Sequence, residues 1–158
     1  MLWVRGVIFT LVAPVLVAVA VPSWIAPERH VRGGAWSFGW LLIGLGAVLY
    51  LHCLRRFLAA GGTPAIFFTR PLRGFLGEEP ASLVSSGLYR RSRNPMYLGV
   101  VLAVAGQAIV FASGAIAGYA GLLTLFFHAI VTLVEEPHLR AEHGEGYEDY
   151  ARRVPRWL

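Results

Sequence analysis

Four long apolar runs restrict the fold of this chain more than any other feature, and they cover about residues 4–26, 35–54, 96–112 and 115–134. A helix needs roughly 20 apolar residues to cross a bilayer, and only the third run falls short of that length. Charged residues make up only 15% of the chain, against about 25% in an ordinary soluble domain. No segment shows the alternation typical of a strand. We therefore expect an all-α integral membrane protein, a single domain of residues 1–158 with four transmembrane helices.

Tryptophans bracket the first run. Trp3 and Trp24 would lie about 32 Å apart along a helix, close to the thickness of a hydrocarbon core. A cleaved signal peptide is the alternative, with Arg5 as its charged start and residues 18–20 as a small-residue cleavage site. Its apolar core would be longer than the roughly 7–15 residues that a signal needs, so we expect a retained span.

The distribution of arginine predicts the orientation in the membrane. All 14 basic residues are arginine; the N-terminal segment holds one, residues 55–95 hold seven and residues 135–158 hold four, against two between the first two runs. Because basic residues favour the cytoplasmic side, we expect both termini, the loop 55–95 and the tail 135–158 to be cytoplasmic, in a bacterial inner membrane. We expect the net charge of +5 to interact with anionic membrane lipids, and we expect no nucleic acid as a partner.

The segments between the runs predict local structure. Glycine and proline interrupt residues 61–92, which we expect to form an interfacial loop with a short amphipathic piece. Only a tight turn separates the last two runs, so these should form an antiparallel hairpin. Its close packing is expected through Gly99-x-x-x-Ala103 and Gly114-x-x-x-Gly118, since small residues let membrane helices approach each other.

A polar stripe follows the fourth run. Thr124, His128, Thr132, Glu135 and Glu136 recur at helical spacing and share one face. An ionisable group at the centre of a membrane helix costs about 2.5–3.5 kcal/mol on insertion scales, so the stripe needs an explanation. Two explanations stay open: the glutamates are solvated at the interface and His128 bonds to a neighbouring helix, or the stripe carries function.

The tail begins at a proline. Pro137 suits the first turn of a new helix, so we expect the chain to kink at the membrane surface and to continue as a cytoplasmic, interfacial helix. Such a helix can simply lie on the bilayer. Alternatively, Tyr147 and Tyr150 close over a pocket lined by the glutamates.

A second polar cluster precedes the third run. Asn94-Pro95 is typical of a turn followed by the start of a helix, which leaves the first backbone N–H groups exposed as an anion site. The surrounding arginines can also be interpreted as a basic collar at the lipid headgroups, and the residues alone do not decide between the two.

Several spaced elements of the second half of the chain occur in a fixed order. They are Gly87-Leu88-Tyr89, Asn94-Pro95-Met96-Tyr97, Glu135-Glu136, Gly144 with Tyr147 and Tyr150, and Val154-Pro155. From about residue 81 to the C-terminus, this pattern resembles the isoprenylcysteine carboxyl methyltransferase and phospholipid methyltransferase superfamily of integral membrane enzymes. An ordered set of motifs is far more specific than one short motif.

The resemblance implies S-adenosylmethionine as methyl donor and S-adenosylhomocysteine as product. The implied donor-binding residues are Ser82, Leu83, Val84, Tyr89, Asn94, Pro95, Met96, Tyr97, Glu135, Tyr147 and Tyr150. If the acceptor is an amine or a thiol, Glu136 or His128 is the candidate catalytic base. No metal is expected, because His138 and His143 lack the i, i+4 spacing of a metal-binding histidine pair.

Three positions depart from the pattern of the superfamily, and one of them is Leu88, where proline is frequent. Asn94 stands where many relatives have histidine, and Val131 stands where relatives acting on prenylcysteine have an arginine for the substrate carboxylate. We expect an S-adenosylmethionine-dependent methyltransferase that acts at the cytoplasmic face on a lipophilic or membrane-associated amine, thiol or carboxylate, with the carboxylate disfavoured. The alternative is a non-enzymatic membrane scaffold or small transport subunit. The sequence leaves open the acceptor, the oligomeric state and the role of residues 64–82.

Overall fold

The computed structural model describes residues 4, 14–28, 30–31, 34–63, 80 and 82–158. In chain order they form the π-helical turn η1 (Leu16–Ala20), α2 (Val21–Ile25), α3 (Trp36–Ala59), the 3-10 turn η3 (Gly87–Arg90), α5 (Pro95–Val110), α6 (Gly114–Ile130), the π-helical turn η4 (Val131–Glu135), α7 (Glu136–His143) and α8 (Glu145–Arg153). These residues include no strand, so the all-α prediction is confirmed for the described part of the chain.

Two described helices are long and apolar enough to cross a membrane. They are α3 and the continuous helix Gly114–His143, whereas Leu16–Ile25 and Pro95–Val110 are shorter. The prediction of four such helices is therefore met only in part. The second run also continues as a helix past Arg55 and Arg56 to Ala59, beyond the expected end at residue 54. Most of the first half of the first run, and the amphipathic piece expected within 61–92, lie outside the described residues.

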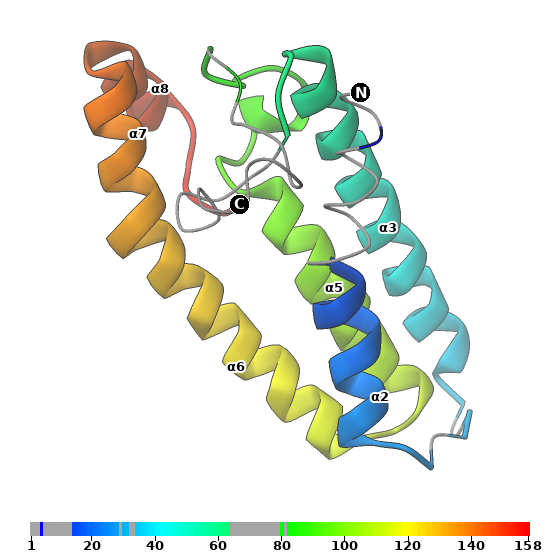
Figure 1. Ribbon diagram of the computed structural model, residues 1–158. Coiled ribbons are helices and arrows are strands. Elements are labelled where there is room, and N and C mark those ends of the chain that lie inside the picture. Colours follow the sequence, from blue (N-terminus) through cyan, green and yellow to red (C-terminus); the bar gives the residue numbers. More distant parts are fainter. Residues whose placement is uncertain (1–3, 5–13, 29, 32–33, 64–79, 81) are drawn as a thin grey trace.

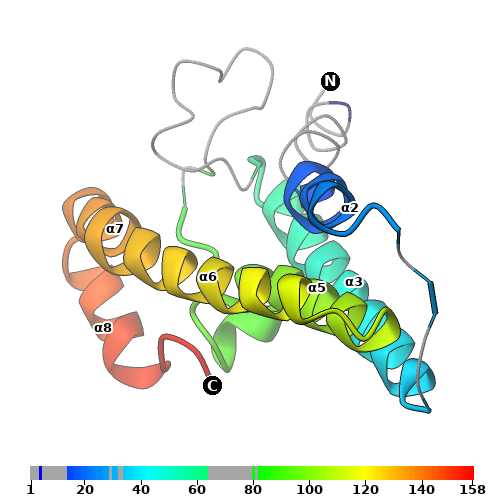
Figure 2. The same cartoon turned by 90° about the horizontal axis from the view of Figure 1, so that it is seen from below.

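The long helices define two ends of the molecule (Figure 1). We call one the turn end; it holds the turn between α5 and α6, the last residue of α2 and the first residue of α3. At the other, which we call the polar end, α3 ends, α5 begins, and α7, α8 and the C-terminus lie. Toward the polar end, α6 diverges from α3 and α5, and α8 folds back beside α7 (Figures 1 and 2).

Glycines join α3 to α5 at backbone distance. A Cβ placed on Gly39 would lie 2.7 Å from the carbonyl oxygen of Gly106, and one on Gly99 would lie 2.7 Å from the carbonyl oxygen of Gly46. Both helices repeat the glycine after seven residues and run antiparallel, so the two contacts lie two turns apart on one seam. Only residues without a side chain allow the two backbones to approach so closely. Close backbone contact of this kind stabilises helix pairs in lipid, where no hydrophobic driving force brings helices together.

The predicted glycine contact between the last two helices is wrong. Gly99 and Ala103 lie against α3, and a Cβ on Gly114 or Gly118 would meet open space. The hairpin itself forms, because α5 and α6 are joined by a short turn in which Ser113 accepts a hydrogen bond from the backbone N–H of Ile116. The spacing indicated a close contact correctly but gave no information on which helix would be the partner.

Carbonyl groups of the first described helix receive polar side chains from α5 and α6. Pro22 has no N–H to offer to the Ala18 carbonyl four residues earlier, and the chain forms the π-helical turn η1 just before it. Gln107 Nε2 donates to the Ala18 oxygen at 2.6 Å, and Tyr119 donates to the Val17 oxygen at 3.0 Å. The Ala18 carbonyl, which receives no hydrogen bond from Pro22, is thus bonded by a side chain of another helix.

A π-helical turn also precedes the second proline, Pro137, and Figure 1 shows the helix change direction between α6 and α7, where the kink is expected. The helix runs on from α6 through η4 into α7, visible as one continuous helix in Figure 2. In η4 the N–H of Glu136 bonds to the Val131 oxygen five residues earlier, so a wider turn lies just before the proline, which has no N–H to donate. The glutamate pair therefore stays attached to the membrane helix.

Candidate active site

The start of α5 presents open backbone amides. Pro95 has no N–H, and the N–H groups of Met96 and Tyr97 have no partner within the helix because they lie in its first turn. Asn94 occupies the N-cap position but makes no capping bond. Its side-chain amide donates instead to the carbonyl oxygen of Arg156 at 2.9 Å. The Asn94 side chain therefore does not cap the helix, and the backbone N–H groups of the first turn are able to bind an anion.

Tyr97 and Glu135 meet beside this first turn. The Tyr97 hydroxyl donates to Oε1 of Glu135, and the ring of Tyr97 lies 4.5 Å from that of Phe127, centroid to centroid. Glu135 is the last residue of the π-helical turn η4, a feature that is frequent at functional sites. A carboxylate, two aromatic rings and open amides are therefore grouped at the polar end.

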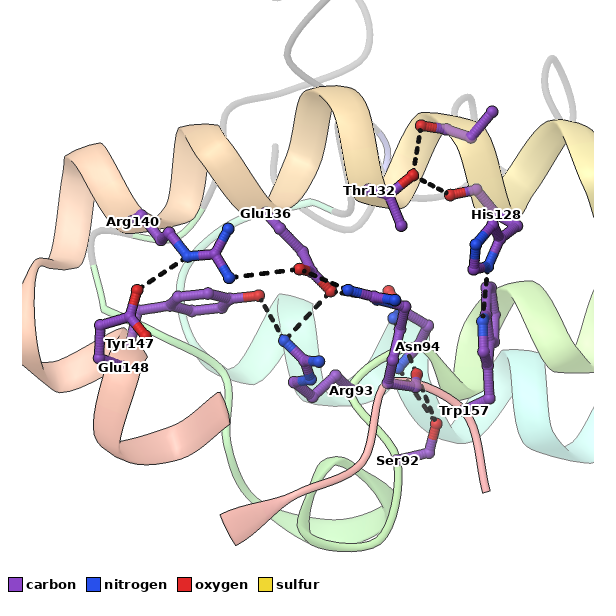
Figure 3. A network of polar contacts seen from close by, with 12 residues as sticks. Ser92, Arg93, Asn94, His128, Thr132, Glu136, Arg140, Tyr147, Glu148 and Trp157 are labelled. Atoms are coloured by element: carbon purple, nitrogen blue, oxygen red, sulfur yellow. Dashed lines mark hydrogen bonds and ion pairs between the residues drawn. The ribbon is translucent and has the colours of Figure 1, made fainter. Parts of the chain in front are cut away.

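Glu136 lies in a separate cluster of arginines, seen in Figure 3. Its side chain is 4% exposed and lies 3.1 Å from Arg93 and 2.6 Å from Arg156, with Arg140 at 3.6 Å. A second bond joins Arg156 to the other carboxylate oxygen at 3.1 Å, so this pair is bidentate. The adjacent glutamates thus have different surroundings, one against a tyrosine of α5 and one within an arginine cluster.

The charges around Glu136 set its protonation. Burial by itself would raise the pKa of this carboxyl, but the hydrogen bond from Arg156 and the charges of Arg93, Arg156 and Arg140 hold the pKa below its ordinary value. The hydrogen bond to Glu136 in turn raises the pKa of Arg156. A carboxylate that is held charged by three guanidinium groups is a weak proton acceptor, so the geometry favours a positioning role for Glu136 over its expected role as a base.

The C-terminal segment is bound along the loop before α5. The backbone N–H of Arg93 donates to the Pro155 oxygen at 3.0 Å, and the Ser92 hydroxyl lies 3.5 Å from the Arg156 oxygen, beside the Asn94 bond already described. Both Ser92 and Asn94 are buried. The last residues of the chain therefore help to shape the beginning of α5.

A family model described as phospholipid methyltransferase matches residues 35–146, more than half of the chain. The chain belongs to the phospholipid methyltransferase family. Comparisons with curated proteins and with solved structures found no match. Membership in this family identifies the chain as a membrane methyltransferase. The family lies in the superfamily that the motifs predicted, so the predicted resemblance is confirmed.

In this methyltransferase the two tail tyrosines support the site from a distance. Tyr147 accepts a hydrogen bond from Arg93 at 3.0 Å, and Tyr150 donates to the backbone oxygen of Tyr89 at 2.7 Å. Both pack with Val154 in a small buried cluster, and burial raises the pKa of each phenol. Their contacts hold α8 against the loop before α5.

His128 contacts the end of the chain. The indole N–H of Trp157 donates to Nδ1 of His128 at 3.2 Å, and the two rings stack with centroids 6.2 Å apart. Figure 3 shows this pair beside the arginine cluster. Because tryptophan is only a donor, His128 Nδ1 is the acceptor and the proton of the neutral ring lies on Nε2.

The remaining predicted site residues lie around these groups. Tyr89 is buried, Met96 packs against the main core, Leu83 packs against the tail cluster, and Ser82 is exposed. Val84 is half-buried.

Sequence reasoning missed the contacts of Arg93 and Arg156 with Glu136 and the contact of Trp157 with His128. A twenty-residue separation between Glu136 and Arg156 has no periodic signal, so only the folded chain reveals their contact.

No group of three or more histidine, cysteine, aspartate or glutamate side chains that could hold a metal ion occurs among the residues that the structure describes.

Proposed function

We propose that this membrane methyltransferase uses S-adenosylmethionine and methylates an amine of a lipophilic acceptor at the cytoplasmic face of a bacterial inner membrane. The contact of Tyr97 with Glu135 beside the open amides of α5 carries the proposal. The four-span topology, with both termini cytoplasmic, belongs to the same proposal and is supported by the arginine distribution.

The grouped residues suit the chemistry of such a donor. The open N–H groups of Met96 and Tyr97 would receive its carboxylate, and the charge of Glu135 would receive its ammonium group. The rings of Tyr97 and Phe127, in contact with each other, provide faces that attract a cation such as a sulfonium. When bound, the donor supplies an electrophilic methyl group attached to a positively charged sulfur.

The residues of the arginine cluster would position the site. Glu136 holds Arg93 and Arg156, and the backbone of these two arginines is bonded to the C-terminal segment and to Asn94. Methyl transfer needs alignment of donor and acceptor more than proton transfer. We therefore assign Glu136 to positioning, together with Tyr147, Tyr150 and Asn94, and we place Tyr97 and Glu135 in contact with the donor.

The surroundings of Val131 support an amine or a thiol as acceptor. This side chain is 1% exposed, in the core of the π-helical turn η4. A carboxylate acceptor would need a positively charged side chain at this position to balance its charge. A buried valine provides no such charge. Amine lipids should therefore be methylated faster than prenylcysteine acids.

Calorimetric titration of the purified protein with S-adenosylmethionine tests the donor site. Glu135→Gln should weaken binding by about 1.5–3 kcal/mol, the range for a hydrogen bond to a charged group, or roughly 10- to 150-fold. Glu142→Gln is the matched control, because Glu142 is an exposed residue of α7, and it should leave binding unchanged. Equal affinities for all three proteins would remove Glu135 from the site. A wild-type protein that binds no donor would favour the scaffold alternative.

A further inference from the structure

His128 lies on a surface of α6 that faces away from the helix core. The residue is exposed, and its neighbours Leu125 and Phe126 are 68% and 55% exposed, as expected for a helix in contact with lipid. An N–H group that is exposed to hydrocarbon without a partner is unfavourable. The polarity of His128 thus needs a reason beyond packing.

Trp157 determines which hydrogen bond His128 can make. The indole donates to Nδ1 and stacks on the ring, so the neutral ring has its proton on Nε2 and can only donate from that atom. No contact engages Nε2 within the part of the chain that the structure describes. His128 is therefore arranged as a hydrogen-bond donor, not as the base that the sequence suggested.

The position of His128 along the helix indicates what it can reach. Glu135 follows His128 by seven residues and lies about 10 Å farther along the axis, and the π-helical turn η4 between them turns the two side chains away from a common face. His128 is the deeper of the two, toward the turn end. An amphiphile with its reacting headgroup at Glu135 would place the linkages to its chains, several bonds from the headgroup, at the level of His128.

We propose that His128, oriented by Trp157, determines specificity by donating a hydrogen bond from Nε2 to an acyl ester oxygen of the lipid acceptor. The inference rests on the proposed function, because it requires an amine lipid as acceptor. An ester carbonyl is a good acceptor for such a donor, whereas an ether linkage has no carbonyl.

Two lipids with the same amine headgroup test this proposal: diacyl phosphatidylethanolamine and its dialkyl ether analogue, in mixed micelles. The wild-type protein should have a lower KM for the diacyl lipid by about fivefold, as expected from one neutral hydrogen bond. His128→Leu should abolish the preference, and Trp157→Phe, which keeps a stacked ring but removes the indole donor, should reduce it. His128→Gln, which retains an N–H donor, should preserve part of it.

Separate measurements distinguish the possible outcomes. His143→Leu, a histidine at the end of α7, should keep the wild-type preference, and binding of S-adenosylmethionine should be unchanged in every variant. An equal KM for both lipids in the wild-type protein, or a preference that survives His128→Leu, would overturn the role of His128. If the wild-type protein methylates neither lipid but still binds the donor, the amine-lipid acceptor of the proposed function fails, and the inference with it.

Discussion

Along the seam with α3, α5 meets its neighbour through backbone atoms at four glycines, whereas at the polar end it meets α6 and the tail through hydrogen bonds and ion pairs. The first contact depends on the absence of side chains, and it extends over two turns of helix. The second depends on a few charged and polar groups from segments far apart in sequence. The comparison indicates that one side of α5 is a rigid support, while its first turn is a site whose shape depends on specific polar partners.

Removing the charge of Glu136 should have the largest effect on this arrangement. Glu136→Gln removes the carboxylate that pairs with Arg156 and with Arg93, whose side chain is only 11% exposed, whereas Arg140 keeps its ion pair with Glu148. Breaking a buried ion pair costs about 3 kcal/mol, so the free energy of unfolding, measured by denaturant titration in detergent, should fall by about that amount.

Two comparisons sharpen this prediction. Glu148→Gln removes an ion pair with Arg140 in which both side chains are 46% exposed, and it should cost less than about 1 kcal/mol. Because the pKa of Glu136 is lowered in the folded protein, its contribution is present above the ordinary carboxyl pKa and is lost as the pH falls through the lowered value. Glu136→Gln should lack this acid dependence. Equal losses for the Glu136 and Glu148 variants would contradict the ranking.

A methyl group on the glycine seam should have the next largest effect. Gly39→Ala places a Cβ 2.7 Å from the Gly106 oxygen, and overpacking of this kind costs about 1–3 kcal/mol. The same substitution at Gly44 meets nothing within 4 Å, so Gly44→Ala should be neutral or stabilising by up to about 1 kcal/mol, through helix propensity. Thermal denaturation of both variants measures the difference, and a Gly39 variant as stable as the Gly44 variant would show that α3 and α5 do not touch in this way.

The smallest effect is expected where α5 holds the first described helix. Gln107→Leu removes the donor to the Ala18 oxygen, and the loss of one such bond costs about 1 kcal/mol. Thr124→Val is a suitable control, because among the described residues Thr124 bonds only to the Ala120 oxygen of its own helix, and its loss should change the stability less. The free energies of unfolding of the two variants decide this point; a larger loss for Thr124→Val would contradict a role of Gln107 between helices.

Much of the fold could be predicted because helical periodicity is a local property. The apolar runs predicted α3, α5 and α6, and the Asn94-Pro95 turn predicted the start of α5. The glycine spacing predicted close packing but not its partner. The expected kink at Pro137 followed from its missing N–H, but the π-helical turn η4 beside it was not predicted, because that turn depends on how the helix packs on both sides.

The candidate site shows the same division. The motifs brought Tyr97 and Glu135 to attention, and the structure places them in contact. They assigned Glu135 to the donor and Glu136 to base catalysis, but they did not predict the three arginines that surround Glu136. The contacts of Arg156 and Trp157 depend on the path of the last four residues, and a chain terminus carries little pattern from which that path can be predicted.

By itself, the sequence determined that this chain is helical and apolar and that it carries the spaced motifs of a membrane methyltransferase, because hydropathy, helical period and motif order are all properties of neighbouring residues. Only the tertiary structure decided which helix the glycines touch, which glutamate faces α5 and which ring atom of His128 carries the proton. These outcomes depend on contacts between residues 20 to 67 positions apart. Such contacts form only after the helices have packed, and no local pattern specifies them.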